Sequence, residues 1–580
     1  MSYRPPVRDL VLALYAAGLD RLEPHFPGLD RDMVQAVLDA AGDLAADVLA
    51  PLNRVGDQQG SRLENGRVVS PPGFPAAYRA FVDGGWNSLS APADFGGQAL
   101  PKALELAVFE MVNGANMAFA LCPTLTQAAI EAVHEHGSDR QKRLYLPKLV
   151  SGEWPGTMHL TEPQAGSDLA AIRTTATPAA DGTWRLNGQK IFITWGDHDL
   201  SDNIVHMVLA RTLDAPAGVR GLSLFLACSR IVDDEGRPGV ANGLRVGGLE
   251  HKLGIHASPT CVMLYEDAQA ELVGQLHQGL PQMFTMMNAA RVMVGVQGVG
   301  VAEAAAQKAA EYARERRQGR SAWTGEAPAP IADHPDVRRM LVLMRAKTEA
   351  ARAICLSAGA AADLARASPD AAERRTAQMR AELLTPIAKA WSTDVGVEVA
   401  SLGVQVHGGM GFIEETGAAQ FYRDARIAPI YEGTNGIQAI DLVGRKLPMG
   451  EGEAISALLE DIRGAADAAA GVQGMASVAE RLRDGVRAAE QASQWLTAHP
   501  GPDALAGAVA YQTLLGDVLG GALLARMAVT AAGEGDDAYA GWRAVLARVY
   551  ADQVLALGPG RLAAVQMGAQ DLKAAEPVLG

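Results

Sequence analysis

A single carboxylate, Glu432, stands where the sequence could support proton removal. It lies in the stretch Ile430-Tyr-Glu-Gly-Thr434, with apolar residues before it and a turn-forming glycine after it. A carboxylate that is partly shielded from water holds its proton more tightly than a solvated one, which suits it to act as a general base. The pattern makes Glu432 a candidate catalytic base, although an ordinary loop carboxylate is the more common case for such a stretch.

A glycine-rich segment, Gln405-Val-His-Gly-Gly-Met-Gly-Phe412, precedes this carboxylate. Its glycines let the backbone approach a bulky ligand closely and adopt φ values that other residues resist. The segment is therefore a candidate for docking a cofactor, although many glycine-rich loops bind nothing.

Two further stretches could hold a flat polar ligand. The loop Thr161-Glu-Pro-Gln-Ala-Gly-Ser-Asp168 presents two hydroxyls, of Thr161 and Ser167, together with several backbone N–H groups. Further on, Phe192 and Thr194 are expected on one face of a strand, because strand side chains alternate with period two. An aromatic ring could pack against a flat heteroaromatic ligand, and a hydroxyl beside it could form a hydrogen bond with that ligand. The alternatives are an ordinary turn and a core-plus-edge pair.

Basic residues mark two more candidate contacts. The segment Tyr312–Arg320 ends an apolar helix with clustered arginines, which suit phosphate groups but are also favoured at a helix end by the macrodipole. Asn288 and Arg291 are three residues apart and share one helical face. They could meet a ligand phosphate or simply cap the surface of the helix.

The elements that must position these residues fall into four parts. Helical periodicity gives way to alternating strand patterns, then returns twice, the second time after a Pro/Gly-rich linker. Between two strand-like runs, Asn187-Gly188 predicts a hairpin turn. The predicted fold is mainly α with a central β-barrel-like domain. The predicted parts are a helical domain (1–155), a β-domain (156–275), a second helical domain (276–447) and a helical extension (453–580).

Bulk properties exclude several classes of protein. At 580 residues the chain is too long for one core, and a net charge of −15 argues against a nucleic-acid partner. Two long apolar tracts, 291–310 and 504–532, are interrupted by polar and charged residues and are expected as buried helices rather than membrane spans. The start lacks the apolar core of a signal peptide, which favours the cytoplasm. Four scattered cysteines offer no metal site or disulfide framework.

Together, the motifs above resemble the acyl-CoA dehydrogenase family in their order and spacing. The resemblance covers roughly residues 40–447 and includes Glu315-Arg-Arg-Gln-Gly319 and the stretch from Tyr422 to Thr434. It implies a helical domain, a β-domain and a four-helix-bundle-like domain. The N-terminal segment and the helical extension are similar to those of a longer bacterial subgroup.

The resemblance also implies FAD as cofactor, an acyl-CoA thioester as substrate, and Glu432 as the base for α,β-desaturation. The site residues that it implies can be grouped by role. Thr161, Ser167, Phe192 and Thr194 would line the flavin ring; Arg316, Gln405 and Gly409 would contact the pyrophosphate and adenosine part, partly from a neighbouring subunit; Thr434 and Asn435 would complete the FAD site; Ser167, Asn288, Arg291 and Gly433 would face the substrate.

An electron-transferring flavoprotein as acceptor and a homodimer or homotetramer are implied in the same way. Two departures from the family pattern concern FAD. Phe192 stands where many members have Trp, and His334-Pro335 lacks a Gln that often follows the His. The remaining alternatives are an acyl-CoA oxidase that uses oxygen and, against the acidic charge, a non-catalytic DNA-binding flavoprotein of the same fold.

Overall fold

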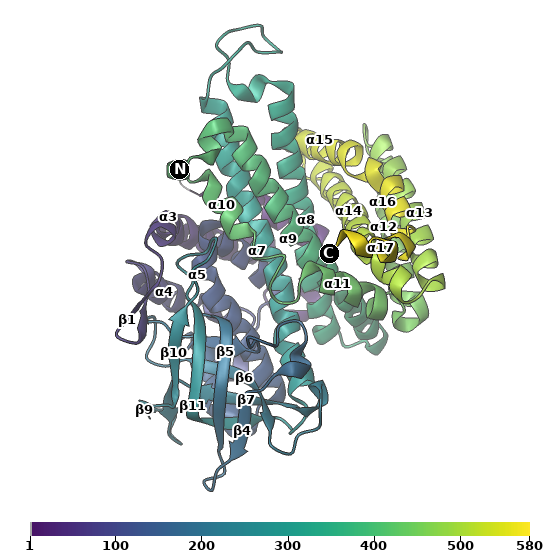
Figure 1. Cartoon of the computed structure of the whole chain (residues 1–580). Helices are drawn as coiled ribbons and strands as arrows, with labels where there is room; N and C mark the ends of the chain where they lie inside the picture. Colours follow the sequence, from purple (N-terminus) through teal and green to yellow (C-terminus); the bar gives the residue numbers. More distant parts are fainter. Residues whose placement is uncertain (1–2, 580) are drawn as a thin grey trace.

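The N-terminal helical part is built around one long, buried helix, α5, in the computed structural model, which describes residues 3–579 (Figure 1). Helix α5 carries a kink where Asn116 leaves helical geometry (φ −161°, ψ 89°), and the Asn116 side chain accepts a hydrogen bond from the Phe119 N–H. The elements of this part are α1 (Val7–Ala16), α2 (Arg31–Asp43), a π-helical segment (Leu44–Leu49), α3 (Ala50–Gln59), β1 (Arg62–Glu64), β2 (Arg67–Val69), α4 (Phe74–Asp83), α5 (Lys102–His136) and α6 (Asp139–Ser151).

A closed β-barrel follows. Strands β11, β5, β4, β6 and β7 pair in a ring, while β10 adds to β11 and β3 adds to β6. Ring closure removes the unpaired edges that an open sheet would leave. The strands are β3 (Gly156–His159), β4 (Thr175–Pro178), β5 (Trp184–Thr194), β6 (Val205–Thr212), β7 (Leu222–Cys228), β8 (Arg230–Val232), β9 (Pro238–Ala241), β10 (Leu244–Leu249) and β11 (Thr260–Val273).

The hairpin predicted at Asn187-Gly188 is wrong. Both residues lie inside the continuous strand β5, where Asn187 pairs with Thr175 of β4 and Gly188 pairs with Tyr265 of β11. The Asn187 side chain accepts a hydrogen bond from the Asp267 N–H at a bulge in β11. Pairing on both sides holds the segment extended, so long-range contacts override the local turn preference.

The second helical domain is a bundle of long helices. The C-terminal ends of helices α7 (Gly279–Glu315) and α9 (Ala371–His407) lie side by side, where the Tyr312 ring stacks on the His407 ring with centroids 4.4 Å apart. Its elements are α7 (Gly279–Glu315), α8 (Pro335–Ala367), α9 (Ala371–His407), a 3-10 turn (Gly408–Phe412), α10 (Ala418–Ala425), α11 (Asn435–Asp441) and a π-helical segment (Leu442–Lys446).

The C-terminal extension packs against this bundle, on the right in Figure 1. Gly516 of α14 lets the Trp391 ring approach closely, since a Cβ there would lie 2.3 Å from the ring, and Trp391 donates to the Asp517 carboxylate at 3.0 Å. The helices are α12 (Glu453–Ala470), α13 (Ala476–Ala498), α14 (Pro502–Ala532), α15 (Asp537–Gln553), α16 (Gly558–Val565) and α17 (Gln570–Ala574).

Within residues 3–579, two helices, α5 and α14, are long and apolar enough to cross a membrane by length and composition alone. Their most apolar windows are 100% and 83% buried inside the protein. Both therefore serve as core helices in this structure, as expected for the second predicted apolar tract. The first tract lies within α7, most of whose side chains from Ala290 to Ala306 are buried.

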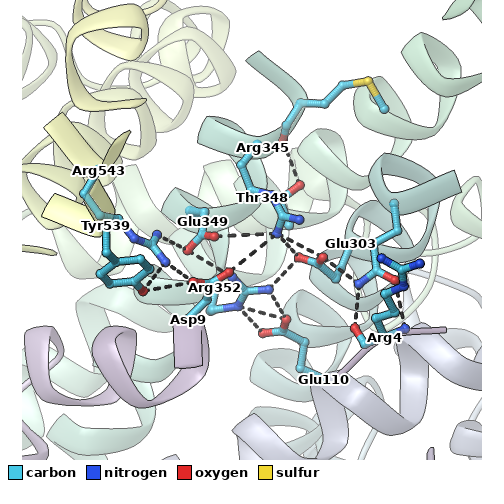
Figure 2. A network of polar contacts seen from close by, with 12 residues as sticks. Arg4, Asp9, Glu110, Glu303, Arg345, Thr348, Glu349, Arg352, Tyr539 and Arg543 are labelled. Carbon is cyan, nitrogen blue, oxygen red and sulfur yellow. Dashed lines mark hydrogen bonds and ion pairs between the residues drawn. The ribbon is translucent and has the colours of Figure 1, made fainter. Parts of the chain in front are cut away.

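A buried ion network joins the bundle to both ends of the chain (Figure 2). Its centre is Arg352 of α8, whose side chain is fully buried. The guanidinium lies 2.6 Å from Glu110 of α5, 2.8 Å from Glu303 of α7 and 3.0 Å from Glu349 of its own helix. Because an unpaired buried charge is costly, these groups depend on one another.

The network extends through Glu349 to the extension. Arg543 of α15 lies 3.0 Å from Glu349 and also contacts Asp9 of α1 (Figure 2). Tyr539 donates its hydroxyl hydrogen to Asp9 at 2.9 Å. The first and fifteenth helices are thus tied together through the middle of the molecule.

Candidate active site

Glu432 sits in a strained turn between α10 and α11. Its φ is +57° and that of Gly433 is +80°, so two successive residues are left-handed. This conformation is unfavourable for a glutamate and persists only when its surroundings enforce it. On one side Tyr431 donates its hydroxyl hydrogen to Gln297 of α7, and on the other the Asn435 N–H donates to the Pro429 carbonyl at 3.0 Å.

The environment of Glu432 suits a base that works near neutral pH. Burial raises the pKa of Glu432 to about 7, and the positive charges of Arg291 and Lys389 pull it back toward its usual value. The Arg291 guanidinium donates to the Asn288 side chain at 3.1 Å, and its other end lies 3.8 Å from the position that a Cβ on Gly433 would take. Arg291 therefore touches the turn that carries the predicted base.

Thr434 and Asn435, predicted to contact FAD, hold the turn in this structure. The Thr434 hydroxyl caps α11 by accepting the Ile437 N–H at 3.1 Å. The Asn435 amide donates to the Ala390 carbonyl at 3.0 Å and to Asp394 at 2.8 Å. Both side chains already have internal partners, so anchoring of the turn is their observed role.

Lys389 is a residue that sequence reasoning missed. Its side chain is fully buried on α9, and its ammonium donates to the Asn435 side-chain oxygen at 2.9 Å. The available signal was a lone lysine within the apolar run Pro386-Ile-Ala-Lys-Ala-Trp391. Only the fold reveals that it faces the Glu432 turn.

Strand β5 presents Phe192 at a bulge. Its register against β11 shifts between Lys190 and Ile193, and Phe192 has a φ of +58°. Simple alternation is therefore interrupted between Lys190 and Ile193, while Phe192 and Thr194 lie on either side of the buried Ile193. Phe192 is 58% exposed while Ile193 is buried, and the Thr194 carbonyl accepts the Thr157 hydroxyl at 2.7 Å.

The loop that carries Thr161 and Ser167 is fixed to the same strand. The Thr161 carbonyl accepts the Ile191 N–H at 2.9 Å, and the neighbouring Glu162 forms a buried ion pair with Lys190 at 2.8 Å. Ser167 is exposed at the end of this loop. The structure thus brings the two predicted flavin-ring motifs together along β5.

The structure does not bring Arg316, Gln405 and Gly409 to the base of the same chain. All three are exposed at the far ends of α7 and α9. Helix α7 runs without interruption from Arg291 to Glu315, which at about 1.5 Å per residue separates the two groups by roughly 36 Å. At Gly409 a Cβ would meet nothing within 4 Å, so this backbone is open to a ligand.

A cavity of about 640 Å³ adjoins the Asn288 and Arg291 side chains. Its walls come from α5, α7, α8 and α9, from the end of α11 and from the segment that follows it. Its charged lining residues are Lys102, Glu131, Arg291, Asp363, Arg366, Glu382, Asp441, Arg445 and Lys446. Arg291 therefore stands between this polar cavity and the Glu432 turn.

Four family models match successive parts of the chain. They describe the N-terminal domain (residues 32–153), the middle domain (157–268) and the C-terminal domain (277–447) of acyl-CoA dehydrogenase, and an acetyl-CoA dehydrogenase C-terminal-like domain (458–576).

Known proteins with similar sequences and structures point the same way. The 3-methylmercaptopropionyl-CoA dehydrogenase of Ruegeria pomeroyi is 48% identical over 567 residues, which is 96% of both chains. Among solved structures, ACDH-11 of Caenorhabditis elegans superposes with a TM-score of 0.78 at 22% identity, covering 96% of this chain and 92% of that one. An acyl-CoA dehydrogenase from Bacillus anthracis, solved with FAD, gives a TM-score of 0.75 at 21% identity and covers 95% and 92%. At these identities, the structural matches establish the fold.

Proposed function

The chain belongs to the acyl-CoA dehydrogenase family, and from that premise we propose that Glu432 is the base with which it oxidises an acyl-CoA thioester. The enzyme is an FAD-dependent acyl-CoA dehydrogenase, which converts the Cα–Cβ single bond of its substrate into a trans double bond. The observation that carries the role of Glu432 is its partly buried position in a strained turn, next to two cations.

The chemistry explains why this arrangement is useful. The α-proton of a thioester is weakly acidic, so a carboxylate of raised pKa is better matched to it than a solvated one. The Glu432 backbone N–H and Gly433 face the substrate, where an N–H donor stabilises charge that develops on the thioester oxygen. When bound, FAD supplies the acceptor for the β-hydride.

The residues on β5 and its neighbouring loop fit a flavin. The exposed Phe192 ring offers an apolar face, and the half-buried Thr194 and the loop hydroxyls of Thr161 and Ser167 offer polar contacts. Such a mixture of one flat face and convergent polar groups is typical of a cofactor pocket. Phe192, Thr194, Thr161 and Ser167 therefore line the ring.

The predicted FAD contacts at the far end of the bundle serve the cofactor of a second subunit. Arg316, Gln405 and Gly409 lie together at one end of the bundle, roughly 36 Å along α7 from Arg291. That distance is too great for one dinucleotide to bridge within a chain. The proposal is a homodimer, or a tetramer built from such dimers, in which each FAD is held by two chains.

The proposed substrate is 3-methylmercaptopropionyl-CoA, supported by the 48% identity over 96% of both chains. A medium or long straight-chain acyl-CoA is the alternative. Turnover of the purified enzyme on a panel of thioether, straight and branched acyl-CoAs decides between them. Higher kcat/KM for butyryl-CoA or octanoyl-CoA than for the thioether would reject the first choice.

The proposed electron acceptor is an electron-transferring flavoprotein. Reduced enzyme should pass electrons to that protein and form little hydrogen peroxide in air. Stoichiometric peroxide without another acceptor would instead identify an oxidase.

The rate of flavin reduction should depend on pH through Glu432. Because the pKa of Glu432 is raised to about 7, the reactive carboxylate predominates above that pH, and the rate falls about tenfold for each pH unit well below it. The second-order rate constant for anaerobic flavin bleaching, which reports on the free enzyme, measures this limb between pH 5 and 9. A constant unchanged down to pH 5 would contradict the assignment.

Phe192→Ala should weaken FAD binding about tenfold, since it removes an aromatic face worth roughly 1.5 kcal/mol. Fluorescence titration of apoenzyme with FAD gives the dissociation constant. Leu213→Ala is the matched control, because Leu213 is an exposed apolar residue (79%) of the same domain outside the proposed flavin site. Equal affinities for both variants and the wild type would remove Phe192 from the site.

A further inference from the structure

The ammonium of Lys389 is a buried charge that the mechanism above does not use. The side chain is fully inaccessible on α9, and its hydrogen bond goes to a neutral amide oxygen, that of Asn435 at 2.9 Å. A buried cation is costly unless an opposite charge compensates it. The acidic groups that face Lys389 are Glu432 and Asp394.

The contact between Lys389 and Asn435 fixes which way the Asn435 amide points. An ammonium can only donate, so the amide oxygen must face it, and the amide nitrogen must face the opposite side. There it donates to the Ala390 carbonyl at 3.0 Å and to the Asp394 carboxylate at 2.8 Å. Lys389 on one side and these two acceptors on the other therefore fix the orientation of the Asn435 amide.

Asn435 in turn holds the segment that carries the base. Its backbone N–H donates to the Pro429 carbonyl, which closes the loop around Glu432 and Gly433. A left-handed glutamate costs on the order of 1–3 kcal/mol and needs fixed neighbours on both sides. The Tyr431 contact with Gln297 supplies the anchor on α7, and Asn435 supplies the anchor on α9.

We propose that Lys389 is a positioning residue for the base: it holds Asn435 so that the Glu432 turn keeps its conformation, and its positive charge favours the ionised form of the Glu432 carboxylate. This inference rests on the proposed role of Glu432 and adds a second residue on which its reactivity depends.

The charges around the turn agree with this role. The positive charges of Arg291 on α7 and Lys389 on α9 both lower the pKa of Glu432, while the negative charges of Glu432 and Asp394 raise the pKa of Lys389. Burial lowers the pKa of Lys389 to about 8 and raises that of Glu432 to about 7. Without the charge of Lys389, Arg291 is the only one of these two cations that still lowers the pKa of Glu432. Glu432 should therefore ionise at higher pH.

The test is the pH profile of flavin bleaching in holoenzyme variants. The acidic limb is the part of the profile in which the bleaching rate falls as the pH is lowered. Lys389→Met should shift this limb to higher pH by about one unit, so that the rate is lower at neutral pH and recovers toward pH 9. Lys389→Arg should keep the limb within a few tenths of a unit of the wild type. Lys347→Met removes a lysine charge on α8 that pairs with Glu398 instead, and it should leave the limb unchanged.

Two further variants separate charge from orientation. Lys389→Gln keeps an N–H donor for Asn435 but removes the charge, so it should shift the limb as Lys389→Met does even if the Met variant does not fold. Asn435→Leu keeps the charge but removes the anchor, so it should lower the rate at every pH with a smaller shift. An acidic limb at the wild-type pH in both Lys389→Met and Lys389→Gln would overturn the proposal.

The outcome for Glu432 itself remains distinguishable. Wild-type bleaching in Glu432→Gln would reject the base assignment and this inference with it. An inactive Glu432→Gln together with unshifted Lys389 variants would reject the role of Lys389 alone.

Discussion

Flavin reduction by acyl-CoA is expected to fall by about a thousandfold or more in Glu432→Gln, while FAD remains bound. The amide has nearly the shape of the carboxylate but cannot accept the α-proton. The turn around it is held by Tyr431, Asn435 and the Thr434 cap rather than by the Glu432 side chain. The variant should therefore keep its visible flavin spectrum and its substrate affinity.

Anaerobic stopped-flow measurement of flavin bleaching gives the rate, and the ratio of flavin to protein absorbance gives FAD content. Glu480→Gln, an exposed glutamate of α13, is the matched control and should behave as wild type. Bleaching of Glu432→Gln at a rate near wild type would mean that another group removes the proton. Loss of FAD would mean that the segment has a structural role that the geometry does not indicate.

Arg352→Met is expected to lower the free energy of unfolding by about 3–5 kcal/mol, the usual cost of removing one partner from a buried ion pair. Arg352 is fully buried and contacts Glu110, Glu303 and Glu349 (Figure 2). Methionine fills similar space but leaves these carboxylates without their shared cation. Urea denaturation followed by circular dichroism measures the loss.

A pH series sharpens this prediction. Burial already raises the pKa of Glu110 to about 7, and removal of Arg352 raises it further. A carboxyl whose pKa is higher in the folded than in the unfolded state binds more protons when folded, so the variant should regain stability as the pH falls through that value. The deficit should be smaller at pH 6 than at pH 8.

Arg339→Met is the control, since it breaks an exposed pair with Asp336 on the same helix and should cost less than about 1 kcal/mol. Equal losses for the two variants would show that the buried network contributes no more than a surface pair.

The architecture and the family resemblance were predictable from the sequence and are confirmed, because they depend on periodicity and on motif order. Asn288 and Arg291 were expected on one helical face, and they form a hydrogen bond. Local spacing is sufficient for contacts of this kind, since residues three apart in a helix must be neighbours.

Contacts between distant segments were not predictable. The turn expected at Asn187-Gly188 is absorbed into β5 by partners on both sides, and the bulge at Phe192 depends on the pairing of β5 with β11. The proposed role of Lys389 depends on its hydrogen bond to Asn435, which lies 46 residues further along the chain. In each case the local conformation or contact depends on a residue that is distant in the sequence. A single sequence does not show which residue that is.

The contact between Asp9 and Arg543 also bears on how the protein is made. These residues are 534 positions apart, so a ribosome must release almost the whole polypeptide before they can meet. Contacts between such distant segments form late, because closing a long loop costs entropy before it is rewarded. Until then Asp9 and Glu349 lack one of their cations. A polypeptide that ends before Arg543 therefore leaves the Asp9 and Glu349 carboxylates without this cation.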